Sequence, residues 1–169
     1  MMPAMLFTKA RLHIKTEIRE WIDEQWPWLV EKLNMGDLAE HLVIEPTDEF
    51  FPDKWEASRE AVQNLFGTVV EYAEVDRDRV LLGLLEPQEE MPAALLKQDD
   101  KYLLPIEISE LRDPTVVVAI LSRKLALLRL IDAGLDLKRD DLPLLMDLAC
   151  VVMGLGIFNA NAAVPQVPR

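Results

Sequence analysis

Side chains that could bind a metal through nitrogen or sulfur are scarce in this chain. Only His13, His41 and Cys150 could do so. They fall in three separate segments, without the close spacing that zinc sites show. We therefore predict no transition-metal site and no cofactor. A single cysteine also excludes an intrachain disulfide and is typical of a reducing compartment, and we interpret Cys150 as a small buried hydrophobe.

The common catalytic patterns are not found either. Ser58, Ser109 and Ser122 lie outside any G-x-S-x-G motif and have no histidine nearby in sequence. The acidic pairs Glu89–Glu90 and Asp99–Asp100 lack the spacing of an EF-hand loop, so we interpret them as solvated turns. An all-oxygen Ca²⁺ or Mg²⁺ site stays open in so acidic a chain. The sequence predicts no catalytic residue.

Two adjacent cations, Arg123 and Lys124, lie in the middle of the most apolar stretch, which extends from Asp113 to Phe158. This stretch predicts two apolar helices, residues 114 to about 133 and about 141 to 154. Gly134 is placed to end the first, and Asp140 or Asp141 to cap the second. The first should be buried nearly all round. Cations in such a helix are unfavourable unless they are paired or can reach water.

Two interpretations of these cations stay open. In one, Arg123 and Lys124 extend along the helix edge until their charged groups reach water. In the other, Arg123 forms a buried ion pair with Asp147 of the second helix. The second interpretation predicts that replacing Arg123 with alanine destabilises the fold by about 3–5 kcal/mol. Arg123, Lys124 and Asp147 are the candidate site residues.

Hydrophobic spacing predicts the elements that would position this pair. We expect a helix from Thr16 to before Gly36, kinked or divided at Pro27, and a second helix at about 55–73. We expect strands at 41–45 and 80–85, then a hairpin of 93–97 and 102–108, in which Pro105 marks an edge or a bulge. The prediction is an α+β fold with a small, mostly antiparallel sheet and packed helices. One domain would span residues 1–163, followed by a disordered Pro-rich tail at 164–169.

The charge balance limits the partners. Thirty acidic residues against eighteen basic ones give a net charge of −12. Nucleic acid and anionic membranes bind through Lys and Arg, so we predict neither as a partner. Residues 1–7 are too short for the apolar core of a signal peptide, and the longest apolar run falls short of a membrane span. We therefore expect a cytoplasmic protein.

Three motifs together carry a family resemblance: Glu49-Phe-Phe-Pro-Asp53, the helix start Asp113-Pro114, and Gly154-Leu-Gly-Ile-Phe-Asn-Ala-Asn161. In this order and spacing the chain resembles a little-characterised family of bacterial proteins. In that family the buried helix carries a zincin-type H-E-x-x-H motif, and the following helix carries carboxylates. The resemblance implies a zincin-like pair of core helices.

This chain departs from the family at the metal ligands. Aligned from Asp113-Pro114, the first histidine falls on Arg123, the glutamate on Lys124 and the second histidine on Leu127. The region of the third ligand falls near Pro143, without a carboxylate, whereas Asp147 matches an aspartate of the second helix. The resemblance therefore implies a pseudoenzyme that has lost its metallopeptidase site.

The expected function is a non-catalytic structural or protein-interaction module whose partner is another protein, a homodimer being one option. Two alternatives remain. One is an acidic inhibitor or immunity-type protein that binds a basic partner. The other is an enzyme that uses an unrecognised carboxylate site.

Overall fold

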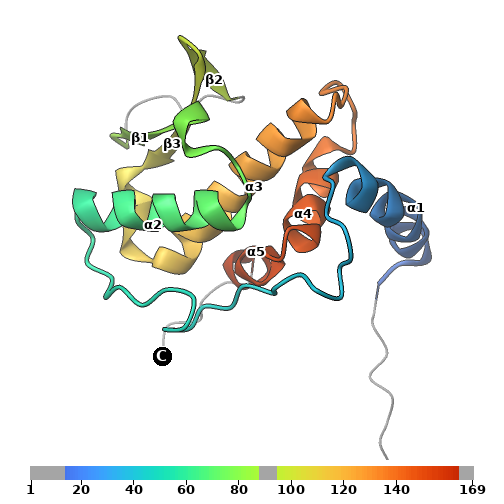
Figure 1. The fold of residues 1–169 in the computed structure, drawn as a ribbon, viewed down its shortest axis with the longest axis horizontal. Helices are drawn as coiled ribbons and strands as arrows, with labels where there is room; N and C mark the ends of the chain where they lie inside the picture. Colours follow the sequence, from blue (N-terminus) through green and yellow to red (C-terminus); the bar gives the residue numbers. More distant parts are fainter. Residues whose placement is uncertain (1–13, 88–94, 164–169) are drawn as a thin grey trace, which may run out of the picture.

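The computed structural model describes residues 14–87 and 95–163, which form one α+β domain, as predicted (Figure 1). The tail at 164–169, residues 93–94, His13 and Glu89–Glu90 lie outside the described residues. The elements, in chain order, are α1 (Thr16–Lys32), α2 (Arg59–Tyr72), the 3-10 turn η1 (Arg77–Arg79), β1 (Val80–Leu85), β2 (Leu96–Gln98), β3 (Lys101–Glu107), the 3-10 turn η2 (Ile108–Arg112), α3 (Pro114–Asp132), α4 (Leu142–Val152) and α5 (Gly156–Ala163).

Helix α3 is the centre of the fold, as the sequence predicts. It begins where Asp113 Oδ1 accepts a hydrogen bond from Thr115 N at 2.8 Å, and Pro114 fits its first turn because no N–H is needed there. Figure 1 shows α3 passing between α2, the sheet and the pair α4 and α5. Most of its side chains are buried, so this helix is enclosed by its neighbours on most sides.

The sheet is mixed, so the expectation of a mostly antiparallel sheet is wrong. Strand order is β1-β3-β2. β1 pairs with β3 in parallel from Val80↔Tyr102 to Leu85↔Glu107, whereas β2 and β3 form the predicted antiparallel hairpin. Residues 86–100 connect β1 to β3, and this connection is long enough for a parallel crossover. Hydrophobic patterns locate strands, but they do not fix which strands pair.

Pro105 lies in the central strand rather than in an edge strand or a bulge. Proline is nevertheless tolerated at this position, because its missing backbone N–H was the basis of the prediction and β2 does not extend this far. Among the described residues, β2 pairs only with residues 101–103 of β3, so at Pro105, opposite Gly83, the described neighbour of β3 is β1 alone. A residue without an N–H therefore removes no hydrogen bond to β2.

The predicted strand at 41–45 does not form. These residues belong to the long connection between α1 and α2. Ile44 is buried while Leu42 and Val43 are exposed, and Ile44 N donates a hydrogen bond to Gly154 O at 2.9 Å. The segment packs against the end of α4 instead of pairing in the sheet. Helix α1 continues across Pro27, so the proline does not divide it.

Phe50 and Phe51 anchor this connection to the core. The ring of Phe51 meets those of Tyr72 and Phe158 edge-on, with ring centroids 5.8 and 5.5 Å away. The Tyr72 hydroxyl donates to Phe50 O at 2.8 Å. Two of the motifs that carry the family resemblance are thus in direct contact through Phe51 and Phe158.

Four helices end in the same turn. The second residue after each helix has a positive φ angle, and the N–H of the residue that follows it donates to the carbonyl five positions back, which is the Schellman arrangement. The positive-φ residues are Asn34, Glu74, Gly134 and Gly154, and the donors that follow them are Met35, Val75, Leu135 and Leu155. Gly134 ends α3 as predicted, and Gly154 lets the chain turn from α4 into α5, a helix that the sequence did not predict.

Arg129 joins two of these helix ends. From the last turns of α3 its guanidinium donates to Leu33 O at the end of α1 and, at 2.8 Å, to Ala73 O at the end of α2. Glu74 lies 3.6 Å from the same guanidinium. A cation is favourable at the negative end of a helix dipole, so one side chain stabilises three helices at once.

A polar cluster fixes α1 against the start of α4. Trp21 Nε1 donates to Asp141 Oδ2 at 2.9 Å, and Arg139 donates to both oxygens of Asp141 at 2.7 Å. Asp141 is the residue before α4, as predicted, but its side chain does not cap the helix. The hydrogen bonds from Arg139, opposed by burial and aided by Trp21, lower the pKa of Asp141 to about 2.

This cluster predicts acid sensitivity. Because the pKa of Asp141 is lower in the folded state, its stabilisation is fully present above the unfolded value near 4 and is lost as the pH falls toward 2. We expect a contribution of about 1–2 kcal/mol at neutral pH, after allowance for partial exposure. Urea unfolding between pH 6 and 2.5 checks this. In Asp141→Asn the loss over this range should be smaller; an unchanged pH profile would contradict the assignment.

Candidate functional site

The structure brings Arg123 and Asp147 together, as one of the two sequence interpretations proposed. Arg123 Nε on α3 lies 3.3 Å from Asp147 Oδ1 on α4. The pair is not buried, however, because the two side chains remain 42% and 45% exposed. The prediction of a buried pair is wrong, since this face of α3 borders a groove rather than the core.

The other interpretation stays a prediction for Lys124, the neighbouring cation, which takes no part in this pair. Lys124 is half-buried, and burial lowers its pKa. It forms no ion pair or hydrogen bond within residues 14–87 and 95–163. Leu127, one turn beyond Arg123, is buried. Arginine and lysine would repel a zinc ion, and leucine offers no lone pair, so the residues at 123, 124 and 127 do not fit a zinc site.

A groove of about 480 Å³ surrounds the ion pair, and α3, α4 and α5 form its walls. The walls are mainly apolar, with Val116 and Ile120 from α3, Val151 from α4 and Ala160 from α5. Val151 is among the more exposed large apolar side chains of the described chain. The groove therefore combines an apolar surface with one accessible pair of opposite charges.

Asn159 on α5 also lines this groove, and its amide is unusual. Both the nitrogen and the oxygen are buried without a hydrogen-bond partner in the described structure. Asn159 lies near the Cys150 thiol. Burial raises the pKa of this thiol and Asn159 opposes part of the rise, although the two side chains form no hydrogen bond of normal geometry. Buried amides are almost always paired. Sequence reasoning missed Asn159, because nothing in the sequence marks it as unpaired.

Cys150 itself is a core residue, as predicted. It is fully buried, and burial raises its pKa to about 12. A thiol with such a pKa supplies almost no thiolate near neutral pH, so it is neither a nucleophile nor a ready metal ligand.

Because the Arg123–Asp147 pair is exposed, its expected contribution to the free energy of unfolding is smaller than the sequence alone suggested. Half-exposed ion pairs contribute about 0–1 kcal/mol, so Arg123→Ala should lower the free energy of unfolding by less than about 1 kcal/mol. Arg79→Ala is a matched control, because Arg79 pairs with Asp132 at similar exposure on a distant surface. Urea unfolding of both variants tests this; a loss of 3 kcal/mol or more at Arg123 would restore the buried-pair interpretation.

The other chemical candidates have structural roles. Ser58 Oγ caps α2 by accepting from Ala61 N, and Ser122 Oγ donates to Val118 O at 2.7 Å inside the core. Asp99 and Asp100 form the exposed turn between β2 and β3, as predicted. His41 lines a surface hollow. Within the described residues, no three His, Cys, Asp or Glu side chains are grouped as metal ligands would be.

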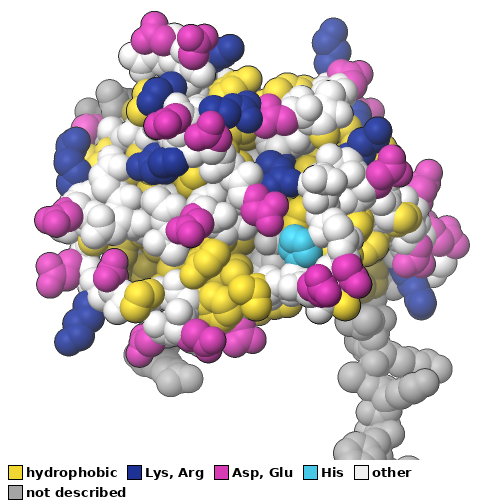
Figure 2. Space-filling view, viewed as in Figure 1, with side chains coloured by type: hydrophobic (Ala, Val, Ile, Leu, Met, Phe, Trp, Pro, Cys, Tyr) yellow, Lys and Arg dark blue, Asp and Glu magenta, His cyan; other side chains and the backbone are white. Residues whose placement is uncertain are grey.

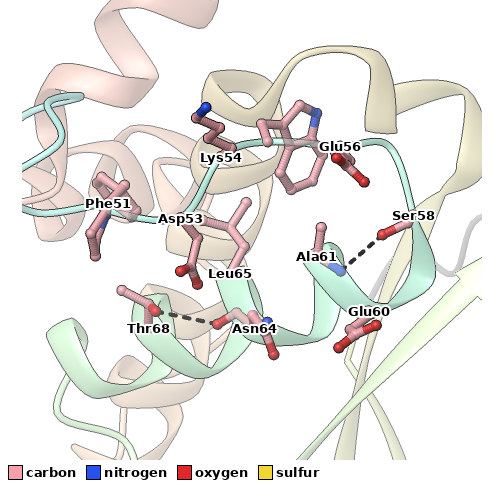
Figure 3. Close-up of a pocket in the computed structure, with 12 residues that line it drawn as sticks. Phe51, Asp53, Lys54, Glu56, Ser58, Glu60, Ala61, Asn64, Leu65 and Thr68 are labelled. Atoms are coloured by element: carbon pink, nitrogen blue, oxygen red, sulfur yellow. Dashed lines mark hydrogen bonds between the residues drawn. The ribbon is translucent and has the colours of Figure 1, made fainter.

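A second hollow, of about 280 Å³, lies between the connection at residues 51–58 and α2. Figure 3 shows that two of its polar groups take part in hydrogen bonds of α2, Ser58 with Ala61 and Thr68 with the carbonyl of Asn64. Asp53 lies at the opposite end of the hollow from Glu56 and Glu60 (Figure 3). These carboxylates are not arranged as a close acid–base pair.

Acidic side chains are spread over the visible face of the molecule and are interspersed with basic ones (Figure 2). The hollow that contains His41 has four carboxylates in its lining, those of Asp37, Glu40, Glu71 and Glu74, and a volume of about 510 Å³. On this face the acidic side chains are thus distributed rather than concentrated in one block.

Comparison with protein-family models, curated proteins and solved structures finds no match to this chain. None of the described helices combines the length and apolar character that crossing a lipid bilayer requires.

Proposed function

We propose that this chain is a non-catalytic relative of zincin-type metallopeptidases that works as a protein-interaction module in the cytoplasm. One observation carries the proposal. Where the resemblance expects a metal held between two helices, Arg123 of α3 faces Asp147 of α4 across 3.3 Å. An arginine supplies the positive charge that a metal would otherwise supply to this carboxylate.

The packing of the resemblance motifs supports the same proposal. Phe51 of the E-F-F-P-D motif contacts Phe158 of the G-L-G-I-F-N-A-N motif, and Ile44 donates to Gly154 O. These contacts hold α5 beside α3 and α4 and so form one wall of the groove. An open apolar groove with an accessible ion pair suits binding of another molecule, because ligand sites combine an apolar lining with a few polar groups.

Two assays test the proposal. Fluorogenic peptide libraries should show no turnover by the purified protein, with or without added Zn²⁺; turnover that a chelator abolishes would overturn it. For the interaction, Ala160→Trp fills the groove, and Ala39→Trp places the same side chain on an exposed loop that does not line the groove. A native partner should be retrieved by the parent and by Ala39→Trp but not by Ala160→Trp. Retrieval that is equal in all three would show that the groove is not the binding surface.

The acidic hollow around His41 favours a second candidate, an inhibitor of a basic protein. Four carboxylates line this hollow, and they would complement Lys or Arg of a partner. This candidate predicts that Glu40→Lys and Glu71→Lys together abolish partner retrieval and that rising salt weakens it. Retrieval that is insensitive to both would remove this candidate.

A further inference from the structure

The groove between α3, α4 and α5 is matched to a definite kind of ligand. We propose that it binds the free C-terminal end of a partner polypeptide whose last side chain is apolar. Arg123 would bind the terminal carboxylate, and Asp147 would accept the N–H of the last residue. This inference rests on the proposed function and names the chemistry of its partner.

Most of the N–H donors of Arg123 have no partner among the described residues. Only Nε approaches Asp147, at 3.3 Å, and Arg123 forms no other ion pair or hydrogen bond in the described part of the chain. A guanidinium has five N–H donors in a fixed plane, and its outer edge binds the two oxygens of a carboxylate in parallel. A half-exposed cation with this edge free, in a chain of net charge −12, is complementary to a carboxylate.

The second argument is the position of Asp147. Its Oδ1 faces Arg123, and its other oxygen forms no ion pair to any described residue. A ligand that fits both side chains needs a carboxylate with an N–H donor close beside it. The last residue of a polypeptide has this arrangement, because one α-carbon separates its amide nitrogen from its carboxylate. A fatty acid lacks the N–H, and an internal peptide segment has no carboxylate on the α-carbon beside its N–H.

The third argument is the shape and lining of the groove. Val116, Ile120 and Val151 provide an apolar wall beside the ion pair. A volume of about 480 Å³ lies within the usual range for ligand pockets, roughly 300–1,000 Å³. This space suits an apolar terminal side chain and the residue before it. Burial of that side chain supplies the non-polar part of the affinity.

Asn159 also lines the groove. Its amide nitrogen and oxygen have no hydrogen-bond partner among the described residues, and a peptide unit has one donor and one acceptor. Because an unpaired buried amide is unfavourable to folding, its presence beside the groove indicates a role in binding. We assign it the peptide unit before the last residue, which its side chain reaches by rotation when the ligand enters.

Fluorescence anisotropy with short fluorescein-labelled peptides tests the inference. Peptides that end in Leu or Val with a free carboxylate should bind the natural protein, and the same peptides with an amidated C-terminus should bind at least about tenfold more weakly, equivalent to about 1.4 kcal/mol. Arg123→Gln should cause a similar loss, whereas Arg79→Gln, the matched exposed arginine, should cause none. Equal affinity for acid and amide peptides, or no binding of either, would overturn it.

Two further arms separate the alternatives. Asn159→Leu should weaken binding of the acid peptides while it raises or leaves unchanged the Tm of the free protein; a lower Tm with unaltered binding would remove Asn159 from the site. Free leucine should compete poorly, and competition as strong as that of the peptide would overturn the choice of a polypeptide end. If Ala160→Trp abolishes partner retrieval but acid and amide peptides bind alike, only this inference fails and the proposed function stands.

Discussion

Replacing Arg129 with alanine is expected to lower the free energy of unfolding by about 3–5 kcal/mol, the loss typical of breaking a buried charged interaction. The side chain is only 14% exposed. Its guanidinium donates to Leu33 O and Ala73 O, and both of these residues are buried. Each hydrogen bond that involves a charged group contributes about 1.5–3 kcal/mol, and the variant leaves both helix-end carbonyls without this donor.

Urea unfolding followed by circular dichroism measures this effect, and two other variants isolate it. Arg129→Lys keeps the charge but loses the forked geometry, so its stability should lie between that of the parent and that of Arg129→Ala. Arg79→Ala removes an arginine whose pair with Asp132 is 39% and 37% exposed, and it should change stability by less than about 1 kcal/mol. Equal effects of the two alanine variants would show that Arg129 does not connect the helices.

The second large effect is expected at Gly154, where alanine should destabilise the fold by roughly 3–5 kcal/mol. Two causes add. The φ angle of Gly154 is +79°, a region that costs other residues about 1–2 kcal/mol. In addition, a β-carbon there would lie 2.3 Å from Leu42 O, so the backbone of the connection between α1 and α2 would have to move.

Gly134→Ala is the matched control for Gly154→Ala. Gly134 has nearly the same φ angle, +77°, and ends α3 in the same kind of turn, but a β-carbon there meets nothing within 4 Å. Gly134→Ala should therefore lower the free energy of unfolding only by the cost of the positive φ angle, about 1–2 kcal/mol. Thermal unfolding of both variants separates the two terms. If Gly154→Ala lost no more stability than Gly134→Ala, the close approach of Leu42 would not matter energetically.

Local patterns predicted the elements that depend on local chemistry. The Asp113-Pro114 signal placed the start of α3, Gly134 placed its end, and the apolar run at 80–85 gave β1 without error. Each of these features depends on backbone preferences or on the burial of consecutive residues, and both are determined by residues that are neighbours in the sequence.

Features that depend on distant partners could not be predicted in this way. The parallel pairing of β1 with β3 depends on where the hairpin docks. Nothing in the sequence distinguishes Arg129 from the other cations of this apolar helix. It stabilises the fold because the ends of α1 and α2 meet beside it and supply the carbonyls to which it donates. The Arg123–Asp147 pair was anticipated, but its exposure depends on α5, a helix that was not expected.

The most direct test of the central claim is a calorimetric Zn²⁺ titration of two proteins, the natural chain and a variant that combines Arg123→His, Lys124→Glu and Leu127→His. These changes rebuild H-E-x-x-H on the α3 face opposite Asp147. If the groove is a former metal site, the natural protein should bind no Zn²⁺ and the rebuilt one about one equivalent, with lower affinity when Asp147→Asn is added. Stoichiometric Zn²⁺ in the natural protein, or none in a folded rebuilt variant, would contradict the claim.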